Sequence, residues 1–409
     1  MEDKLTRSVR TMKLNKFVIL SAIMILGGAV SATAQFNAVH KILNHTRNQR
    51  TEIVIPKVNG FNVYKADFHT HTIFSDGEVT PALRVEEAWR DGLDIIGITD
   101  HMEYRRTERL IYKYMKGYIR EDLRGEDKAV NTNVLNTDPD QRGLLVDFNV
   151  SYDSAKKKGD ELGIMVVRGV EITRGKLGDY NAIFTKDNNT IYDPDLETSI
   201  RNARAQGAFI MHNHPQYTKE TASTMPKHCE DFHAKGLIDG MEVANAYQIF
   251  SSLINYCVDN GYAPMSSSDV HTLTSLYYPD AGKEYFRNMT LVFAKKCDEK
   301  SIHKALDDRR TIAYRNNLMI GSEKLLTDLF NACISAEVIE ESGNTMKVKF
   351  TNHSSLPFSL RWEKYREAAI WGHSSTVANV KAGTKVLDVR VTNMLYNKTK
   401  SPVVPVKLK

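Results

Sequence analysis

Short apolar runs alternate with amphipathic segments over residues 61–335. Six runs have the length and composition of buried strands. They are "DIIGITDH", "GIMVVRGVEI", "GAFIMHNHP", "DGMEVANAY", "APMSSSDVH" and "MTLVFA". Three of the segments between them, "TPALRVEEAWRDG", "PDLETSIRNARAQG" and "DEKSIHKALDDRR", have helical patterns. This alternation predicts a parallel sheet with helices outside it, either a barrel or a doubly wound sheet.

The first of these helices has clear end signals. Thr80 can cap its N-terminus, Pro81 suits its first turn, and Gly92 follows its last residues. Ser or Thr before a helix, Pro at its start and Gly past its end are the preferred residues at those positions. We therefore expect a helix between Pro81 and Gly92.

The pattern changes after residue 335. In "AEVIEES", "TMKVKFTN", "SLRWEK" and "KVLDVRVTN", apolar and polar residues alternate, and turn sequences such as "SGN" and "KAGT" separate these runs. Alternation with period two is typical of strands with one buried face. Residues 336–409 are therefore predicted to form a small, Ig-like antiparallel β-sandwich domain.

The first 34 residues form a third pattern. Basic residues precede "FVILSAIMILGGAV", an apolar stretch of 14 residues, and the small residues of "SATAQ" follow it. A membrane-spanning helix needs about 20 apolar residues, so this pattern predicts a secretory signal peptide over residues 1–34. We expect translation to start at Met1 or Met12, and the protein to be exported to the periplasm or beyond, with no stable membrane insertion after signal removal. Residues 35–60 are a polar lead-in.

Composition and charge narrow the class of partner. Of the 409 residues, 42% are hydrophobic and 26% are charged, as in ordinary globular proteins. The net charge is +5, and part of it belongs to the signal segment. This excess is too weak to indicate a nucleic-acid surface, so we expect no nucleic-acid partner. The four cysteines are widely spaced, and we expect buried free thiols.

Candidate metal ligands follow the predicted strands at their carboxyl ends. In "FHTHTIFSDG", residues 68–77, His69 and His71 are two residues apart and so share one face of an extended chain. The others are Asp76 in the same stretch, Asp100 and His101 in "ITDH", Glu171 in "GVEIT", His212 and His214 in "MHNHP", and Asp269 and His271 in "SSSDVH". Barrel enzymes keep their active sites at this end of the strands. We therefore expect one metal site there, with His214 favoured over His212 because Pro215 limits the strand.

These stretches resemble a known family. In order and spacing, "HTHTIFSDG", "ITDH", "GVEIT", "NHP" and "SDVH" are similar to the successive motifs of the PHP (polymerase and histidinol phosphatase) superfamily, over roughly residues 60–330. The resemblance implies a distorted (β/α)7 TIM-like barrel, over residues 61–335, that holds two or three metal ions and hydrolyses phosphoesters.

The resemblance also implies a set of ligands. The first ion would be held by His69, His71, Glu171 and Asp269, the second by Asp76, His101 and His214, and a third by Glu171 as a bridge, shared with His271. Family members usually have a further His after the Glu motif, and this sequence has Asp179 there, in "RGKLGDYNAIF". Asp179 can still bind a hard ion, and the alternative is a turn residue beside Gly178.

Further residues have expected roles beside the ions. We expect Glu171, Asp269 and Asp100 to be the catalytic acidic residues, Asp100 by orienting His101 or a neighbouring ligand. Candidates for phosphate contacts, or else ordinary surface arginines, are Arg105, Arg106 and Arg174.

Imidazole and carboxylate ligands without thiolates suit Zn, Mn or Fe. Two or three such ions lower the pKa of a bridging water, and the resulting hydroxide can attack phosphorus. We therefore expect an exported metal-dependent phosphoesterase acting on a small phosphomonoester or phosphodiester. The alternatives are an amidohydrolase-like enzyme acting on a carbon centre and a metal- or glycan-binding protein without turnover.

Overall fold

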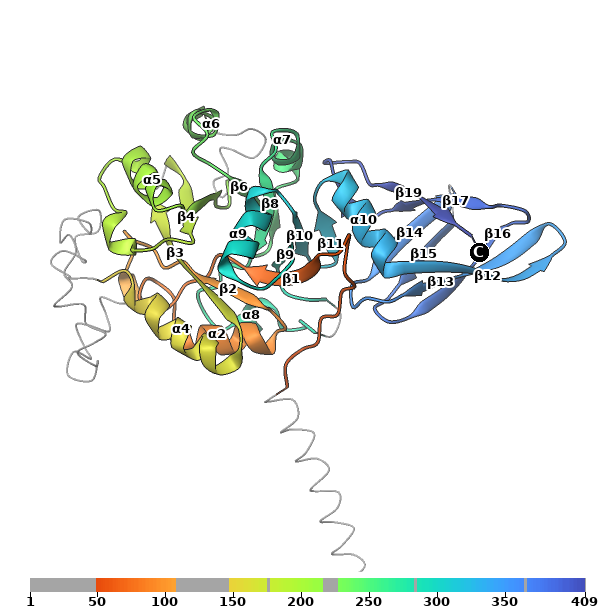
Figure 1. Ribbon diagram of the computed structural model, residues 1–409, viewed down its shortest axis with the longest axis horizontal. Coiled ribbons are helices and arrows are strands. Elements are labelled where there is room, and N and C mark those ends of the chain that lie inside the picture. The colour runs from red at the N-terminus through yellow and green to blue at the C-terminus, as the bar shows by residue number, and fades with distance from the viewer. Residues whose placement is uncertain are drawn as a thin grey trace, which may run out of the picture. The chain divides into compact units, whose positions relative to one another are not determined.

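A curled, mixed sheet of twelve strands organises most of the chain (Figure 1). In this computed structural model the described residues are 49–107, 147–174, 177–215, 227–282, 285–363 and 366–408. Residues Thr51–Lys409 form one compact unit. The predicted signal peptide and the first part of the lead-in lie outside the described residues. Within the described ranges, no helix has the length and apolar character needed to cross a membrane.

The strands of this sheet run in the order β18-β11-β10-β9-β1-β2-β3-β4-β5-β6-β7, with β8 paired to β6. Their bounds are β1 Asn62–Asp67, β2 Ile95–Ile98, β3 Met165–Thr173, β4 Asp179–Ile183, β5 Phe209–His212, β6 Gly240–Asn245, β7 Gln248–Ile249, β8 Ala263–Ser267, β9 Met289–Ala294, β10 Thr311–Arg315, β11 Leu318–Ile320 and β18 Met394–Leu395. All six apolar runs singled out in the sequence therefore contain strands, as predicted.

The expected all-parallel arrangement is only partly present. Parallel ladders join β1 to β2, β2 to β3, β5 to β6, and β6 to β8. However, β4 pairs antiparallel with both β3 and β5, and β9 pairs antiparallel with β1. The reason is local, since β4 follows β3 after a short turn, and a crossover helix needs a dozen or more residues. The fold is mixed α/β, and the strand order does not reproduce a regular (β/α)7 alternation.

The helices are α2 Pro81–Arg90, α4 Val150–Leu162, α5 Leu196–Ala205, α6 Lys227–Ala234, α7 Ile254–Asp259, α8 Thr274–Tyr277, α9 Glu299–Asp307 and α10 Glu323–Cys333. The three predicted helices correspond to α2, α5 and α9. Thr80 caps α2 as expected, because its side chain accepts a hydrogen bond from the backbone N–H of Leu83, and Pro81 is the first helical residue. Gly92 follows the helix with a φ of +91°, which a side chain would disfavour.

The segments that follow β1 and β8 meet beyond the strands, although β1 and β8 are not neighbours in the strand order. The backbone N–H of Asp269, after β8, donates to the carbonyl of His69, after β1, at 2.9 Å, and the N–H of His71 donates to the carbonyl of Val270 at 3.1 Å. These bonds place the segments 69–71 and 269–271 side by side. The carboxyl ends of β1 and β8 therefore meet where the sequence places four candidate ligands.

The last part of the chain forms two small antiparallel sheets, as predicted, although an Ig-like connectivity stays a prediction. One sheet has the order β12-β13-β16 and the other β15-β14-β17-β19. The bounds are β12 Ile334–Ser342, β13 Thr345–Asn352, β14 Phe358–Glu363, β15 Arg366–Ile370, β16 Ser375–Lys381, β17 Val386–Val391 and β19 Val403–Lys407. The expected boundary at residue 336 lies just inside β12. One C-terminal strand, β18, instead pairs with β11 of the large sheet.

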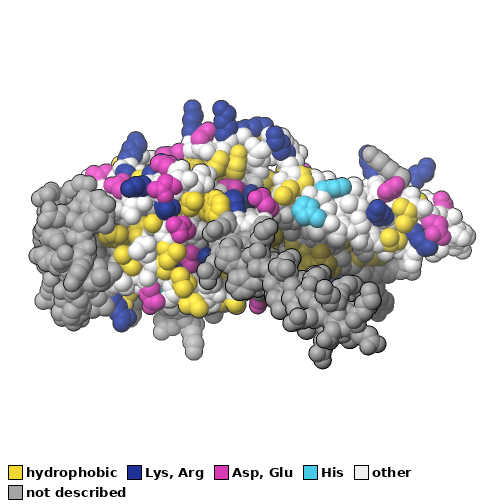
Figure 2. All heavy atoms as spheres, turned by 90° about the horizontal axis from the view of Figure 1, so that it is seen from below, with side chains coloured by type: hydrophobic (Ala, Val, Ile, Leu, Met, Phe, Trp, Pro, Cys, Tyr) yellow, Lys and Arg dark blue, Asp and Glu magenta, His cyan; other side chains and the backbone are white. Residues whose placement is uncertain are grey.

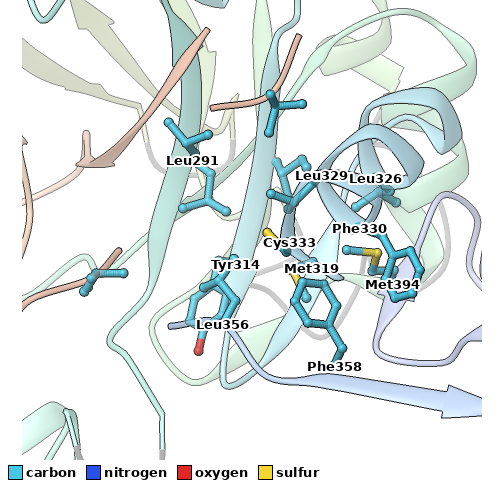
Figure 3. Close-up of a cluster of buried hydrophobic side chains, with 14 of the residues drawn as sticks. Leu291, Tyr314, Met319, Leu326, Leu329, Phe330, Cys333, Leu356, Phe358 and Met394 are labelled. Atoms are coloured by element: carbon cyan, nitrogen blue, oxygen red, sulfur yellow. The ribbon is translucent and has the colours of Figure 1, made fainter. Parts of the chain in front are cut away.

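An apolar cluster around α10 joins the large sheet to these strands (Figure 3). Phe330 of α10 meets Phe358 of β14 edge to face, with ring centroids 5.6 Å apart, and both side chains are buried. Leu326 and Cys333 lie on the same side of the helix (Figure 3). All four cysteines are free, as expected, and three are buried, whereas Cys297 is exposed.

This cluster predicts a stability change. Phe330→Ala removes a fully buried ring and should lower the free energy of unfolding by about 3–5 kcal/mol. Lys324→Ala, on the exposed side of the same helix, should change it by less than about 1 kcal/mol, because it removes only a surface ion pair with Asp328. Urea unfolding of both variants measures the difference. Equal midpoints for the two variants would contradict this account of the cluster.

Candidate metal centre

Eight of the nine predicted ligands lie around the ninth, the buried carboxylate of Glu171 on β3. Its Oε2 lies 3.2 Å from Nε2 of His69, 3.2 Å from Nε2 of His71 and 3.1 Å from Nδ1 of His101. Its Oε1 lies 3.5 Å from Nε2 of His214. Glu171 therefore contacts imidazoles from segments that follow three other strands, β1, β2 and β5.

The donor atoms form four overlapping groups, and within each group they all lie within 4.8 Å of one another. The groups are His71, Asp76, His101 and His271; His69, His214 and Asp269; His69, His71 and Glu171; and Glu171, Asp179 and His214. The side chains expected at the carboxyl ends of separate strands thus converge in one place.

The grouping differs from the one that the resemblance implied. His271 lies beside Asp76, with Nε2 3.2 Å from its Oδ2. His214 instead lies near Glu171, Asp179 and Asp269. His271, rather than His214, therefore completes the group around Asp76 and His101. The reason is the closure of the sheet, which brings the segment after β8 against the segment after β1.

Asp179 reaches the cluster because β3 and β4 form an antiparallel pair. Thr173 lies opposite Asp179 in this ladder, and Glu171 lies opposite Asn181. Opposed residues share one face of the sheet, as do residues two apart, so Asp179 and Glu171 lie on the same face. Oδ2 of Asp179 is 3.8 Å from Nδ1 of His214. Asp179 is therefore part of the cluster rather than an isolated turn residue.

Burial and mutual contact shift the proton affinities of these groups. Burial alone would lower the pKa of His71, but hydrogen bonds to Asp269 and Glu171 raise it to about 10. The pKa of His214 rises to about 9 in the same way, through Glu171 and Asp269. Burial lowers the pKa of His101 to about 4. Burial raises the pKa of Asp179 to about 6, and the Glu171 charge adds to this effect.

The donor set fits divalent cations. Nε2 of His69 and Nε2 of His71 face each other at 3.1 Å, so loss of the proton between them leaves two nitrogen lone pairs directed at one point. Oδ1 of Asp179 is buried, with no hydrogen-bond partner among the described residues. A cation between such atoms supplies the positive charge that they lack, and imidazole with carboxylate is a ligand set for Zn, Mn or Fe. The four groups of residues could therefore hold such ions.

Comparison with known proteins agrees with this geometry. A family model described as the PHP domain matches residues 67–241. The structure is similar to that of a two-domain protein of Bacteroides vulgatus described as containing a predicted PHP-like metal-dependent phosphoesterase, with 31% identity and a TM-score of 0.75. The similarity covers 88% of this chain and 99% of that one. The chain belongs to the PHP family.

The match to one curated relative covers only a short stretch of the chain. An uncharacterized protein of Methanocaldococcus jannaschii is 49% identical over 47 residues, which is 12% of this PHP chain and 22% of that protein. The chain thus spans about a fifth of that relative's length, and the match carries no information on the whole protein's activity.

Glu242 of β6 is a buried carboxylate that the sequence analysis missed. Its Oε1 lies 3.0 Å from Nδ1 of His69, and its Oε2 accepts from the backbone N–H of His214 at 2.7 Å and from the Asn245 amide at 2.8 Å. A proton on Nδ1 of His69 is therefore directed to Glu242, which leaves Nε2 facing the cluster. A carboxylate behind a metal-ligating histidine fixes its tautomer and ring orientation. The signal was present in "DGMEVANAY", where Glu242 stands inside a buried strand.

Asp100 does not face the cluster. Its carboxylate accepts from the backbone N–H and the hydroxyl of Thr72, at 2.7 and 2.8 Å, and from the hydroxyl of Ser75 at 2.6 Å. It therefore holds the loop that carries Asp76, in a role that positions ligands. Gly77 closes this loop, because a Cβ atom at position 77 would lie 2.7 Å from the backbone nitrogen of Thr72.

Two buried arginines fix the backbone under the site. Arg84 of α2 donates to the carbonyls of His71 and Val270, at 3.1 and 3.2 Å, and pairs with Glu87. Arg287 pairs with Asp67, which also accepts from the backbone N–H of Ser268 at 3.1 Å. Both arginines thus stabilise the junction between the ends of β1 and β8. Sequence reasoning missed them because charged residues in a helix and a loop resemble surface residues.

Two of the arginines proposed for phosphate contacts have other partners. Arg105 is buried, donates to the carbonyl of His101 at 2.8 Å and lies over the Phe148 ring. Arg174 pairs with Glu103 and donates to the carbonyl of Asp193 at 2.6 Å. Both side chains are directed to structural contacts.

Two other candidates lie outside the donor groups. Arg106 is exposed, and its phosphate contact stays a prediction. His212 lies outside all four groups. It is on the face of β5 that points away from the cluster, where its ring stacks on Tyr180 and its Nδ1 is 3.2 Å from Nε2 of His233.

The Glu242 contact predicts an effect on metal affinity. Glu242→Gln removes the charge behind His69 and should weaken binding of Mn or Zn about 10- to 100-fold. Glu161→Gln, an exposed carboxylate paired with Lys158, is the matched control and should leave affinity unchanged. Competition with a fluorescent chelator measures both. Equal affinities of the two variants would show that Glu242 does not orient a ligand.

The raised histidine pKa values predict a pH effect. In the metal-free protein His71 and His214 keep their protons up to about pH 10 and about pH 9. Cations bind only the neutral imidazoles and therefore displace these protons. Metal affinity should rise as pH increases from 6 to 9, after correction for protonation of the chelator, and calorimetry in two buffers should detect released protons. Constant affinity over this range would contradict the prediction.

Proposed function

We propose that this protein is an exported metal-dependent phosphoesterase that hydrolyses small phosphomonoesters or phosphodiesters. Membership of the PHP family supports metal-dependent hydrolysis, and the single observation that carries the proposal is the convergence of four donor groups around Glu171. Overlapping groups that share Glu171, His69, His71 and His214 could hold two or three ions close together. Ions at such spacing bind the oxygens of a phosphoryl group.

The residues have separable tasks in this proposal. Glu171 would bridge neighbouring ions, because its two oxygens face different histidines. A second ion would be held by Asp76, His101 and His271. A third ion would be held by Asp179, His214 and Glu171. When bound, these ions supply an activated water and neutralise charge on the phosphate oxygens. Phosphoryl transfer depends mainly on positioning and electrostatic stabilisation, and the protein contributes the rigid placement of the ligands.

The backbone around the site supports such placement. Asp269 has a φ of +53° and His214 a φ of +22°, both uncommon for residues with a side chain. Such conformations cost roughly 1–3 kcal/mol each and persist where surrounding contacts fix them. Here those contacts are the bond from the Asp269 N–H to His69 and the bond from the His214 N–H to Glu242. The strained residues are therefore held in place before any ion binds.

Export and a small substrate are further parts of the proposal. The basic and apolar pattern of residues 1–34 supports export. On the face shown in Figure 2, lysine and arginine side chains are interspersed with acidic ones among the described residues. An electrostatic surface for nucleic acid would instead show clustered basic residues. This supports a small phosphorylated substrate.

A substrate panel tests this function. With Mn or Zn, the protein should release p-nitrophenol from p-nitrophenyl phosphate or its bis-ester, and it should not hydrolyse p-nitroanilides. His271→Ala should lower the rate by more than about 100-fold, since loss of a group behind a ligand already costs about 10- to 100-fold. His303→Ala on α9, where the ring contacts Asp307, is the control and should retain activity.

The other outcomes distinguish the alternatives. Hydrolysis of amides alone would favour an amidohydrolase-like enzyme. Tight metal binding without release from any substrate would favour a binding protein. Elemental analysis of the same preparations gives the identity of the ions and shows whether two or three are bound.

A further inference from the structure

The candidate metal centre is open on one side. Side-chain exposure is 0% at His69 and His71 and 1% at Glu171, but it rises to 28% at His271. The residues around His271 therefore line the most exposed approach to the ligands. These belong to the segment that follows β8, together with whatever side chains pack against it.

A pair of stacked tyrosines lies at this side. Tyr247, in the turn between β6 and β7, and Tyr277, at the end of α8, have ring centroids 5.4 Å apart and planes only 6° from parallel. The Tyr277 hydroxyl lies close to the His271 backbone and to Asp269. Burial raises the pKa of this hydroxyl, and the charge of Asp269 adds to the rise. The pair therefore extends outward from two of the candidate ligands.

The outer ring of this pair is exposed. Tyr247 has 60% of its surface accessible although one face of its ring is covered by Tyr277. Leu273 and Leu276, from the same segment as Tyr277, are 42% and 66% exposed. Scattered exposed apolar residues are ordinary on protein surfaces. Two exposed leucines in the segment that carries Tyr277, together with the exposed ring stacked on Tyr277 beside a metal centre, are better explained by a ligand that covers them.

We propose that the free face of the Tyr247 ring binds a planar aromatic ring in the leaving group of the phosphoester substrate. This inference rests on the proposed function, and it adds a substrate class: phosphate esters of alcohols that carry an aryl or nucleobase ring. An aromatic ring stacks on tyrosine whatever its substituents, because every such ring has a π-face. The phosphate would lie at the ions, while the ring would continue the stack that Tyr277 and Tyr247 begin.

The geometry separates this role from simple packing. Tyr277 is half-buried beside the His271 backbone, which accounts for its position. Tyr247 has no such environment, since it follows Ala246, whose φ is +43°, at the tip of a tight turn. The turn presents the ring to solvent rather than to the core. A tyrosine in that position stabilises the fold little and offers a rigid ring with few rotatable bonds.

The test compares two pairs of ligands that differ only in aromaticity. Benzyl phosphate and cyclohexylmethyl phosphate have similar size and both release a primary alcohol, so their leaving groups differ little in reactivity. Benzylphosphonate and cyclohexylmethylphosphonate are the matching non-hydrolysable ligands. The Mn-loaded full chain should prefer the benzyl member of each pair about 5- to 100-fold, in kcat/KM for the phosphates and in Kd for the phosphonates by calorimetry.

Variants test whether the preference for the benzyl ligands depends on the Tyr247 ring. Tyr247→Ala should reduce both preferences to about twofold or less while metal content stays the same, and Tyr277→Phe, which keeps the stack, should retain them. Trp371→Ala removes an aromatic residue of similar exposure, 57%, from the C-terminal sheets and is the control.

The outcomes are distinguishable. Equal affinity of the wild-type chain for the two phosphonates, or a preference that survives Tyr247→Ala, would overturn the inference and leave the phosphoesterase proposal intact. If neither phosphonate binds and neither phosphate is hydrolysed, both the proposed function and the inference fail.

Discussion

Two backbone hydrogen bonds between the end of β1 and the end of β8 determine the rest of the site. They join His69 to Asp269 and His71 to Val270. They hold the segment with the paired histidines against the segment with Asp269 and His271, although β1 and β8 are not neighbours in the strand order. Sequence separation between these segments is about two hundred residues, so closing this contact is entropically costly. Buried arginines on both sides of the junction offset part of that cost by satisfying its carbonyls and carboxylates.

The closed junction also explains why so many charges can be buried together. An isolated buried carboxylate or imidazolium is strongly unfavourable, but paired groups stabilise each other. Around Glu171, the carboxylates raise the proton affinity of His69 and His71, so these two imidazoles are protonated in the metal-free site. Cations bound to the same atoms replace those protons. Glu242 keeps His69 turned towards the other ligands.

The sequence predicted the parts of this arrangement that follow local periodicity. Residues two apart at a strand's end share a face, and this was sufficient to select His69 with His71 and Asp269 with His271. It also located the strands, because their apolar runs are short and bounded by turn residues. Periodicity does not show which strands are neighbours, however. The antiparallel β4, the placement of β9 beside β1 and the transfer of His214 to the group around Asp179 all depend on sheet order. Glu242, Arg84 and Arg287 were missed for a related reason, since a single charged residue in a sequence does not reveal that its partners are buried.

The position of Asp179 shows how sheet order and chemistry combine. It stands on β4, opposite Thr173, only because the chain turns back directly after β3 and does not enter a crossover helix. That hairpin places a carboxylate beside Glu171 where the resemblance implied an imidazole. A carboxylate adds negative charge to a group that already contains Glu171, and burial with this neighbour raises the pKa of Asp179 to about 6. A cation there must therefore compete with a proton near neutral pH. In the group of His71, Asp76, His101 and His271 the competing proton is on an imidazole, because His71 has a pKa of about 10, while Asp76 keeps a pKa of about 2 because contacts with His271 and His101 outweigh its burial. The two outer groups thus differ in charge, since the group around Asp179 combines two carboxylates with one imidazole and the group around Asp76 combines one carboxylate with three imidazoles.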